Sequence, residues 1–279
     1  MTSPREDLLR CLNRKGFEKV HLDFVFCPSQ IESFKQRFGH EDFETYLGLS
    51  HRKIEIPVKR NFKDGQKHFF REILPDTTVF DEYGIGHSKG SEFAFHMTRM
   101  HHPLRGADIN EILNYPYPNV DESQINDFNQ KVADIHAKGL ASFGFMQMTV
   151  WEASWYLRSM EELMIDMMME NEAATILFDK ITDFACSKAR AYATAGIDIL
   201  SLGDDIGTQS SLMIDVGLWE QWLQPRLKKV ALSRLEKCGP KGGIVIGPTH
   251  IVEPEVPWDN LIAIIEAANE YESKINPVK

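Results

Sequence analysis

The chain has 279 residues, of which 43% are hydrophobic and 26% charged, and its formal net charge is −10. These values are those of an ordinary globular protein, so they exclude disorder, collagen-like repeats and coiled coil as the main organisation. The 41 acidic residues outnumber the 31 basic ones, which repels a phosphate backbone, so we expect no nucleic-acid partner. A single α/β barrel of roughly 250 residues and two smaller domains both fit this length.

The N-terminus is polar, and no apolar run approaches the roughly 18 residues that a membrane-spanning helix requires. We therefore expect a cytoplasmic protein with no membrane partner. The four cysteines lie far apart, without CxxC or HxC spacing. The sequence thus predicts reduced thiols and no metal site.

Apolar runs with strand character alternate with helical patterns along the chain. The runs lie at residues 20–26, 140–146, 197–202 and 243–246, with a weaker one at 78–83. Helical spacing of apolar residues occupies 121–139, 159–169 and 171–196, and a last helix begins after Pro257. This alternation predicts βα units around a parallel sheet.

Polar groups follow the ends of these runs, and ligands bind at that carboxyl edge in barrels and doubly wound sheets. The groups are Asp81 and Glu82, Gln147, Asp204 and Asp205, and His250. Residues 61–118 are irregular and rich in histidine, glycine and aromatic side chains. We interpret them as a lid inserted into one domain that spans 1–279, because long loops in compact domains are commonly functional.

Seven motifs occur in an order that resembles the uroporphyrinogen decarboxylase superfamily, which includes that decarboxylase and the corrinoid-linked methyltransferases. They are Phe80–Gly84, His102–Leu104, Tyr115–Pro118, Trp151–Arg158, Gly203–Gln209, Trp219–Lys229 and Gly247–Pro257. The resemblance implies an α/β fold of the TIM (β/α)8 barrel type, with its site at the carboxyl ends of the strands.

The chain departs from the family pattern after Asp205. Up to His250 it shows one clear helix and no convincing strand before Gly243, and the segment between Arg226 and Gly242 is much shortened. About five βα units are recognisable where a full barrel has eight. The barrel is therefore expected to be incomplete, or to be closed by another chain, for example by strand exchange in a homodimer.

The resemblance assigns nine side chains to the site. The expected catalytic residues are Asp205, His250, Tyr156 and Glu82, and the expected substrate-binding residues are Asp81, Trp151, Glu152, Asp204 and Gln209.

Asp204 and Asp205 are adjacent, so at an extended strand end only one of them faces the site. Desolvation there would raise the pKa of that carboxyl and suit it to general acid or base catalysis. The alternative is an Asx turn that supports Gly207.

Each remaining assignment has a structural alternative. His250 donates a proton or binds a carboxylate, or else it only bonds its own loop. Tyr156 and Glu152 orient a substrate and supply an acid, whereas Trp151 and Tyr156 could equally be packing aromatics. Asp81 and Glu82 bind an amine or a leaving group, or they form a solvated loop pair.

Three functions follow from the resemblance. The first is a corrinoid-dependent methyltransferase-like enzyme that moves a methyl group between a small methylated substrate and a cobamide supplied by a partner corrinoid protein. The second is a lyase that decarboxylates a tetrapyrrole, as in porphyrin biosynthesis, although the arginine signature for substrate carboxylates is missing after residues 20–26. The third is a non-catalytic, degenerate paralogue, which the shortened segment favours.

Overall fold

The computed structural model describes residues 2–18, 21–23, 28–63, 67–90, 98–208, 211–238 and 270. Its helices are α1 (Pro4–Leu12), α2 (Pro28–Phe38), α3 (Phe43–Tyr46), α4 (Ile109–Asn114), α5 (Ile125–Ala137), α6 (Trp151–Arg158), α7 (Met160–Met168), α8 (Glu172–Ala195), α9 (Val216–Leu218) and α10 (Gln224–Cys238). Its strands are β1 (His51–Ile54), β2 (Val58–Lys59), β3 (Val79–Phe80), β4 (Gly86–Lys89), β5 (Thr98–His101), β6 (Asn119–Val120), β7 (Ala141–Met146) and β8 (Ile199–Leu202). The fold is mixed α/β.

The central sheet is parallel, with the strand order β1-β7-β8. Its middle strand β7 pairs with β1 through Ala141 and His51, and with β8 through Phe143 and Ile199. The predictions of strands at 140–146 and 197–202 are confirmed. The strand β1 was not predicted, because three of its four residues, in the run His-Arg-Lys-Ile, are polar or charged.

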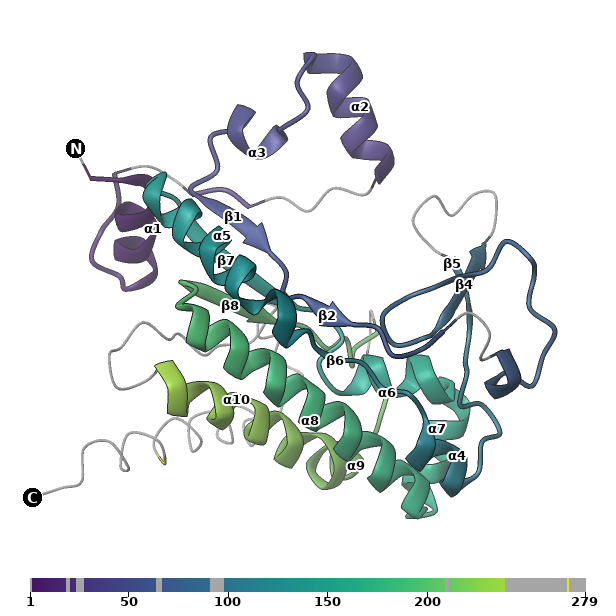
Figure 1. The fold of residues 1–279 in the computed structure, drawn as a ribbon. Helices are drawn as coiled ribbons and strands as arrows, with labels where there is room; N and C mark the ends of the chain where they lie inside the picture. Colours follow the sequence, from purple (N-terminus) through teal and green to yellow (C-terminus); the bar gives the residue numbers. More distant parts are fainter. Residues whose placement is uncertain are drawn as a thin grey trace, which may run out of the picture.

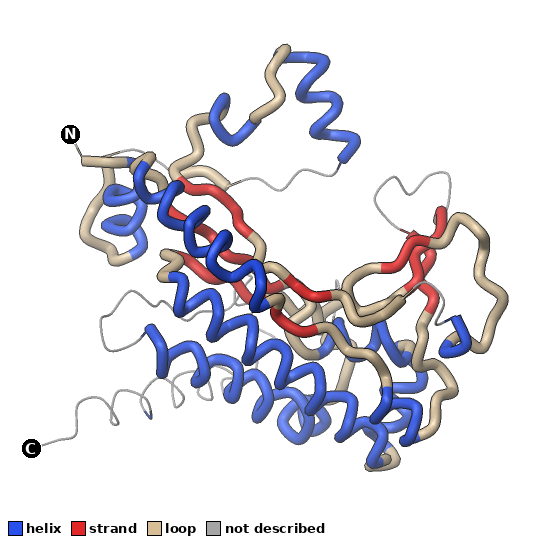
Figure 2. Tube along the Cα trace, viewed as in Figure 1, coloured by secondary structure: helices blue, strands red, loops and turns tan. Residues whose placement is uncertain are grey.

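Helices α5 and α8 lie side by side over the sheet, and α10 packs on α8 (Figures 1 and 2). Gly144 in β7 allows this close packing, because a Cβ atom there would lie 2.7 Å from Ile197 and 2.8 Å from the ring of Tyr192. The buried Tyr192 hydroxyl accepts a hydrogen bond of 2.9 Å from the N–H of Ile56. This bond ties α8 to the segment that follows β1.

The amino ends of the strands are joined by one carboxylate. The guanidinium of Arg5 in α1 donates to Asp198, which directly precedes β8, at 2.8 Å. The same carboxylate accepts the N–H of Ser142 in β7 at 3.0 Å and lies 3.0 Å from Nε2 of His136 in α5. Two helices and two strands are therefore fixed at the edge opposite the carboxyl ends.

Residues 61–118 contain a small sheet of their own, β3-β4-β5, which is antiparallel. The strand predicted at 78–83 is thus present only as β3, and it is wrong as a member of the parallel sheet. The reason is local turn chemistry: Asp81 Oδ1 accepts the N–H groups of Tyr83 and Ile85, and Gly84 adopts a φ of +82°. The chain reverses there and enters β4.

Within the described ranges the parallel sheet has three strands and does not close into a barrel. The predicted strand at 243–246, the helix after Pro257 and most of the run at 20–26 lie outside these ranges. Barrel closure therefore stays a prediction, as does the role of residues 61–118 as a lid.

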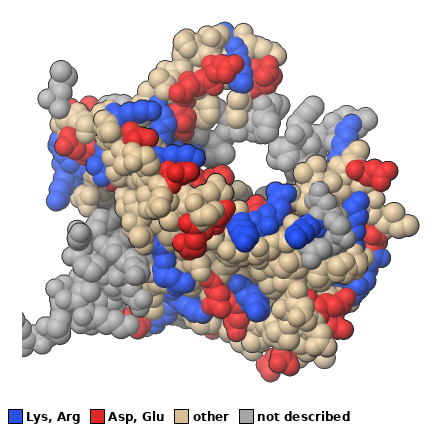
Figure 3. Space-filling model, viewed as in Figure 1, with Lys and Arg blue, Asp and Glu red and all other residues tan. Residues whose placement is uncertain are grey.

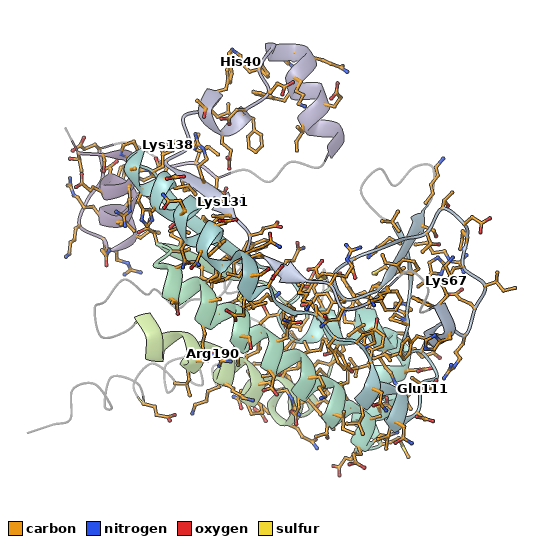
Figure 4. All side chains as sticks on the ribbon, viewed as in Figure 1. His40, Lys67, Glu111, Lys131, Lys138 and Arg190 are labelled. Carbon is orange, nitrogen blue, oxygen red and sulfur yellow. The ribbon has the colours of Figure 1, made fainter. Side chains whose placement is uncertain are left out.

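None of the described helices is long and apolar enough to cross a membrane. On the face shown in Figure 3, lysine and arginine side chains are interspersed with aspartate and glutamate. Lys131 of α5, Lys138 directly after α5 and Arg190 of α8 are exposed on the outer side of the helix layer (Figure 4). These positive charges lie away from the sheet.

We expect the substitution Gly144→Ala to lower the free energy of unfolding by about 1–3 kcal/mol, because the added methyl group overlaps Tyr192 and Ile197. Gly203→Ala is the matched control, since a Cβ there meets its nearest atom at an ordinary 3.6 Å, and it should change stability by less than about 1 kcal/mol. Urea denaturation of the three proteins measures both effects. Equal losses in the two variants would contradict the packing described for Gly144.

Candidate functional site

The site is organised by Asp204, which follows β8 at the carboxyl edge of the sheet. Its Oδ2 atom accepts the N–H groups of Val150 at 2.7 Å and Trp151 at 3.0 Å, and its Oδ1 atom accepts the N–H of Glu152 at 3.0 Å. The first N–H groups of a helix have no partner within the helix, and its N-terminus carries a partial positive charge. One carboxylate therefore satisfies three donors at the start of α6.

Helix α6 presents Glu152 and Tyr156 one turn apart on the same face. The Tyr156 hydroxyl donates a hydrogen bond of 3.1 Å to Oε1 of Glu152. Glu152 is 8% exposed, whereas Tyr156 is half-buried. The pair forms no ion pair with a basic side chain in the part of the chain that the structure describes.

Burial dominates the electrostatics of this edge. Desolvation raises the pKa of Asp204 to about 6, although its three backbone N–H donors favour the charged form. Desolvation also raises the pKa of Glu152, although hydrogen bonds from the backbone N–H of Asp205 and from the Tyr156 hydroxyl oppose the shift. The pKa of Tyr156 is raised by burial and by the charge of Glu152. Burial therefore favours the protonated form of both side chains, more than either would show in water.

The far end of α6 is held by the motif His102–Leu104. The ring nitrogen Nδ1 of His102 lies 2.7 Å from the carbonyl oxygen of Tyr156. The N–H of Leu104 donates a hydrogen bond of 2.9 Å to the carbonyl oxygen of Leu157. Burial lowers the pKa of His102, which favours a neutral ring that donates through Nδ1. His102 thus acts on the backbone that carries Tyr156.

The two adjacent aspartates have different surroundings. Asp204 faces α6, whereas Asp205 is exposed and its Oδ1 accepts the N–H of Gly207 at 3.1 Å, as in an Asx turn. Trp151 is fully buried, and its backbone N–H rather than its ring contacts Asp204. Gln209 and His250 lie outside the described residues.

Asp81 and Glu82 lie in the hairpin turn between β3 and β4 and not at the end of a parallel strand. The Asp81 carboxylate accepts hydrogen bonds from backbone N–H groups and lies 3.1 Å from Nε2 of His87. The neighbouring Tyr83 is buried, and its pKa is raised by burial and by the charges of Glu82, Asp81 and Asp204. The turn therefore comes within electrostatic reach of Asp204.

Lys188 is a buried polar residue that the sequence patterns do not reveal. It lies on α8 with Nζ 3.4 Å from the Tyr83 hydroxyl and 4.7 Å from the ring centroid of Phe184. The sequence does not indicate that this lysine is buried, since lysine is common on amphipathic helices. The described residues contain no group of three or more metal-binding side chains.

No protein-family model matches the sequence, and no curated protein matches it either. Among solved structures, a methyltransferase from Methanosarcina mazei is similar, with a TM-score of 0.52 and 14% sequence identity. The match covers 84% of this chain and 67% of that chain. The two proteins therefore share a fold.

The titration of Asp204 tests the electrostatics of this site. Its pKa is about 6, above the ordinary value of 3.8, so the folded protein holds this proton more tightly than the unfolded chain does. The stability that this proton contributes is complete below pH 3.8 and is lost as the pH rises through about 6.

We therefore expect the wild type to lose stability relative to Asp204→Asn between these two pH values, as measured by urea denaturation. Carbon-13 NMR of the carboxyl group should show a midpoint near 6. A midpoint below the ordinary value would mean that the three N–H donors outweigh burial.

Proposed function

We propose that this protein is a methyltransferase-like enzyme that moves a methyl group between a small methylated substrate and a cobamide. The observation that carries the proposal is the Asp204 carboxylate, which fixes the start of α6 and so places the buried Glu152 beside the half-buried Tyr156 hydroxyl. The shared fold with a methyltransferase supports the reaction class. The order of the sequence motifs supports the proposal that a cobamide is the partner in methyl transfer.

The chemistry required of the protein is modest. A methyl group leaves nitrogen or oxygen readily only when the atom left behind gains a proton or a strong hydrogen bond. In this proposal the Tyr156 hydroxyl donates to that atom, and Glu152, whose pKa is raised by burial, supplies the proton. The positioned pair also holds the substrate in line for attack.

The cobamide enters as a co-substrate, free or on a partner protein, and it supplies the cobalt that accepts or donates the methyl group. Gln147 and Asp205, both exposed, follow β7 and β8 at the same edge. This exposure leaves an approach for a bulky group and fits a cobamide delivered from solution.

The acidic side chains at the carboxyl edge of the parallel sheet favour a neutral or cationic substrate. Glu152, Asp204 and Asp205 all carry carboxyl groups there. Arg99, a cationic side chain of β5, is 67% exposed and lies 3.5 Å from Glu72. A polycarboxylate such as a tetrapyrrole would meet repulsion at this place.

The assay mixes the purified chain with reduced cobalamin and a panel of methylated amines and methoxy-aromatic compounds. The product, methylcobalamin, is followed by absorbance and mass spectrometry. We expect Tyr156→Phe and Glu152→Gln each to lower kcat/KM by about 10²–10⁴-fold, the usual contribution of general acid catalysis.

Tyr46→Phe serves as the matched control, because Tyr46 is 45% exposed on α3, and it should retain the wild-type rate. The proposal fails if no member of the panel methylates the cobalt. It also fails if Tyr156→Phe is as active as the wild type.

A further inference from the structure

A second group of reactive side chains, on β4, on β5 and on the loop that precedes β3, lies away from the parallel sheet (Figure 1). Ser88 Oγ lies 2.9 Å from Nε2 of His101, and Nδ1 of His101 lies 2.8 Å from Oε1 of Glu72. His101 is 1% exposed and Ser88 6%, whereas the Glu72 side chain is 41% exposed. No step of the proposed methyl transfer uses these residues.

The contacts follow the order of a nucleophile, a base and an orienting acid. In such a set the base uses one ring nitrogen for the hydroxyl and the other for the carboxylate, which fixes its tautomer and stabilises the imidazolium. His101 does this with Nε2 on Ser88 and Nδ1 on Glu72. A histidine bonded only to backbone would not show this pattern.

The sequence around Ser88 gives a second, independent indication. Residues 86–90 read Gly-His-Ser-Lys-Gly, which has the G-x-S-x-G spacing of many serine nucleophiles. Gly86 is required by packing, because a Cβ there would lie 3.2 Å from Cβ of His101 and 3.0 Å from Thr78. Glycine thus allows His101 to approach the strand that carries Ser88.

The setting differs from the usual one for this motif. Ser88 lies within β4, paired with Arg99 of β5, and not on a turn between a strand and a helix. The nucleophile is thus held by an antiparallel ladder. Only 6% of the surface of Ser88 is exposed, so only a small group can reach its hydroxyl. A peptide bond within a chain is therefore a poor substrate.

We propose that Ser88 is a nucleophile toward small acyl esters, activated by His101 and Glu72, in a site separate from the carboxyl edge. The Ser88 oxygen forms a bond to the ester carbonyl carbon while its proton passes to Nε2 of His101. The carbon–oxygen bond to the alcohol then breaks, and the alcohol leaves with that proton. Water repeats the sequence on the acyl-serine and releases the acid, which restores Ser88.

The test uses the full chain with two probes, a fluorophosphonate that labels activated serines and 4-nitrophenyl acetate. We expect one label per chain, located on Ser88 by peptide mass spectrometry, and ester hydrolysis above the solution background. Ser88→Ala should abolish the label. Glu72→Gln should slow labelling by at least about tenfold, because the charge that stabilises the imidazolium is lost.

Ser187→Ala is the control, since Ser187 Oγ bonds only the carbonyl oxygen of Asp183 and the guanidinium of Arg190 among the described residues, and it should label like the wild type. Glu72 is exposed, so Glu72→Gln remains informative if Ser88→Ala fails to fold. A wild-type chain that takes no label at Ser88, or a Glu72→Gln chain that labels at the wild-type rate, would overturn the proposal. In either case the three residues would be a structural link within the segment 61–118.

Discussion

The candidate site depends on one interaction, the binding of three backbone N–H groups by the carboxylate of Asp204. It joins the end of β8 to the start of α6 across 54 positions of sequence. The first residues of α6 are nearly all buried, so water could not replace these bonds, and an unpaired N–H there would cost about 1–3 kcal/mol. The direction of α6, and hence the position of Glu152 and Tyr156, follows from this constraint.

The hairpin turn at Asp81 is fixed to the same framework by the buried Lys188. Lys188 of α8 lies in an aromatic setting formed by Tyr83 and Phe184, where cation–π attraction offsets part of its desolvation. Desolvation still lowers the pKa of Lys188, and the charges of Glu82 and Glu55 oppose that shift. The hairpin turn that carries Asp81 and Tyr83 is thereby held against the helix layer, near Asp204.

Much of the parallel framework could be predicted from the sequence, because its elements have strong periodicity and clear ends. The helix predicted at 171–196 ends at Gly196, which adopts the left-handed conformation of a C-cap. The strands at 140–146 and 197–202 are apolar and flanked by turn residues. By contrast, β1 consists largely of polar residues and carries no apolar signal.

The geometry of the sites was less accessible to sequence reasoning. Adjacent aspartates at a strand end predict that only one faces inward, and the structure shows that Asp204 is the one turned toward α6. The acidic pair Asp81 and Glu82 looked like a strand end, but the turn that Asp81 builds places it in a separate sheet. The contacts among Ser88, His101 and Glu72 depend on the register of β4 and β5, which no local pattern encodes.

The most direct test of the central claim is hydrogen exchange at the amides of Val150, Trp151 and Glu152 in the wild type and in Asp204→Ala. If the carboxylate holds these three amides, they should be protected in the wild type and exchange at least about tenfold faster in the variant. Amides in the middle of α8 should be unchanged and serve as the internal reference. Equal protection of the three amides in both proteins would contradict the account.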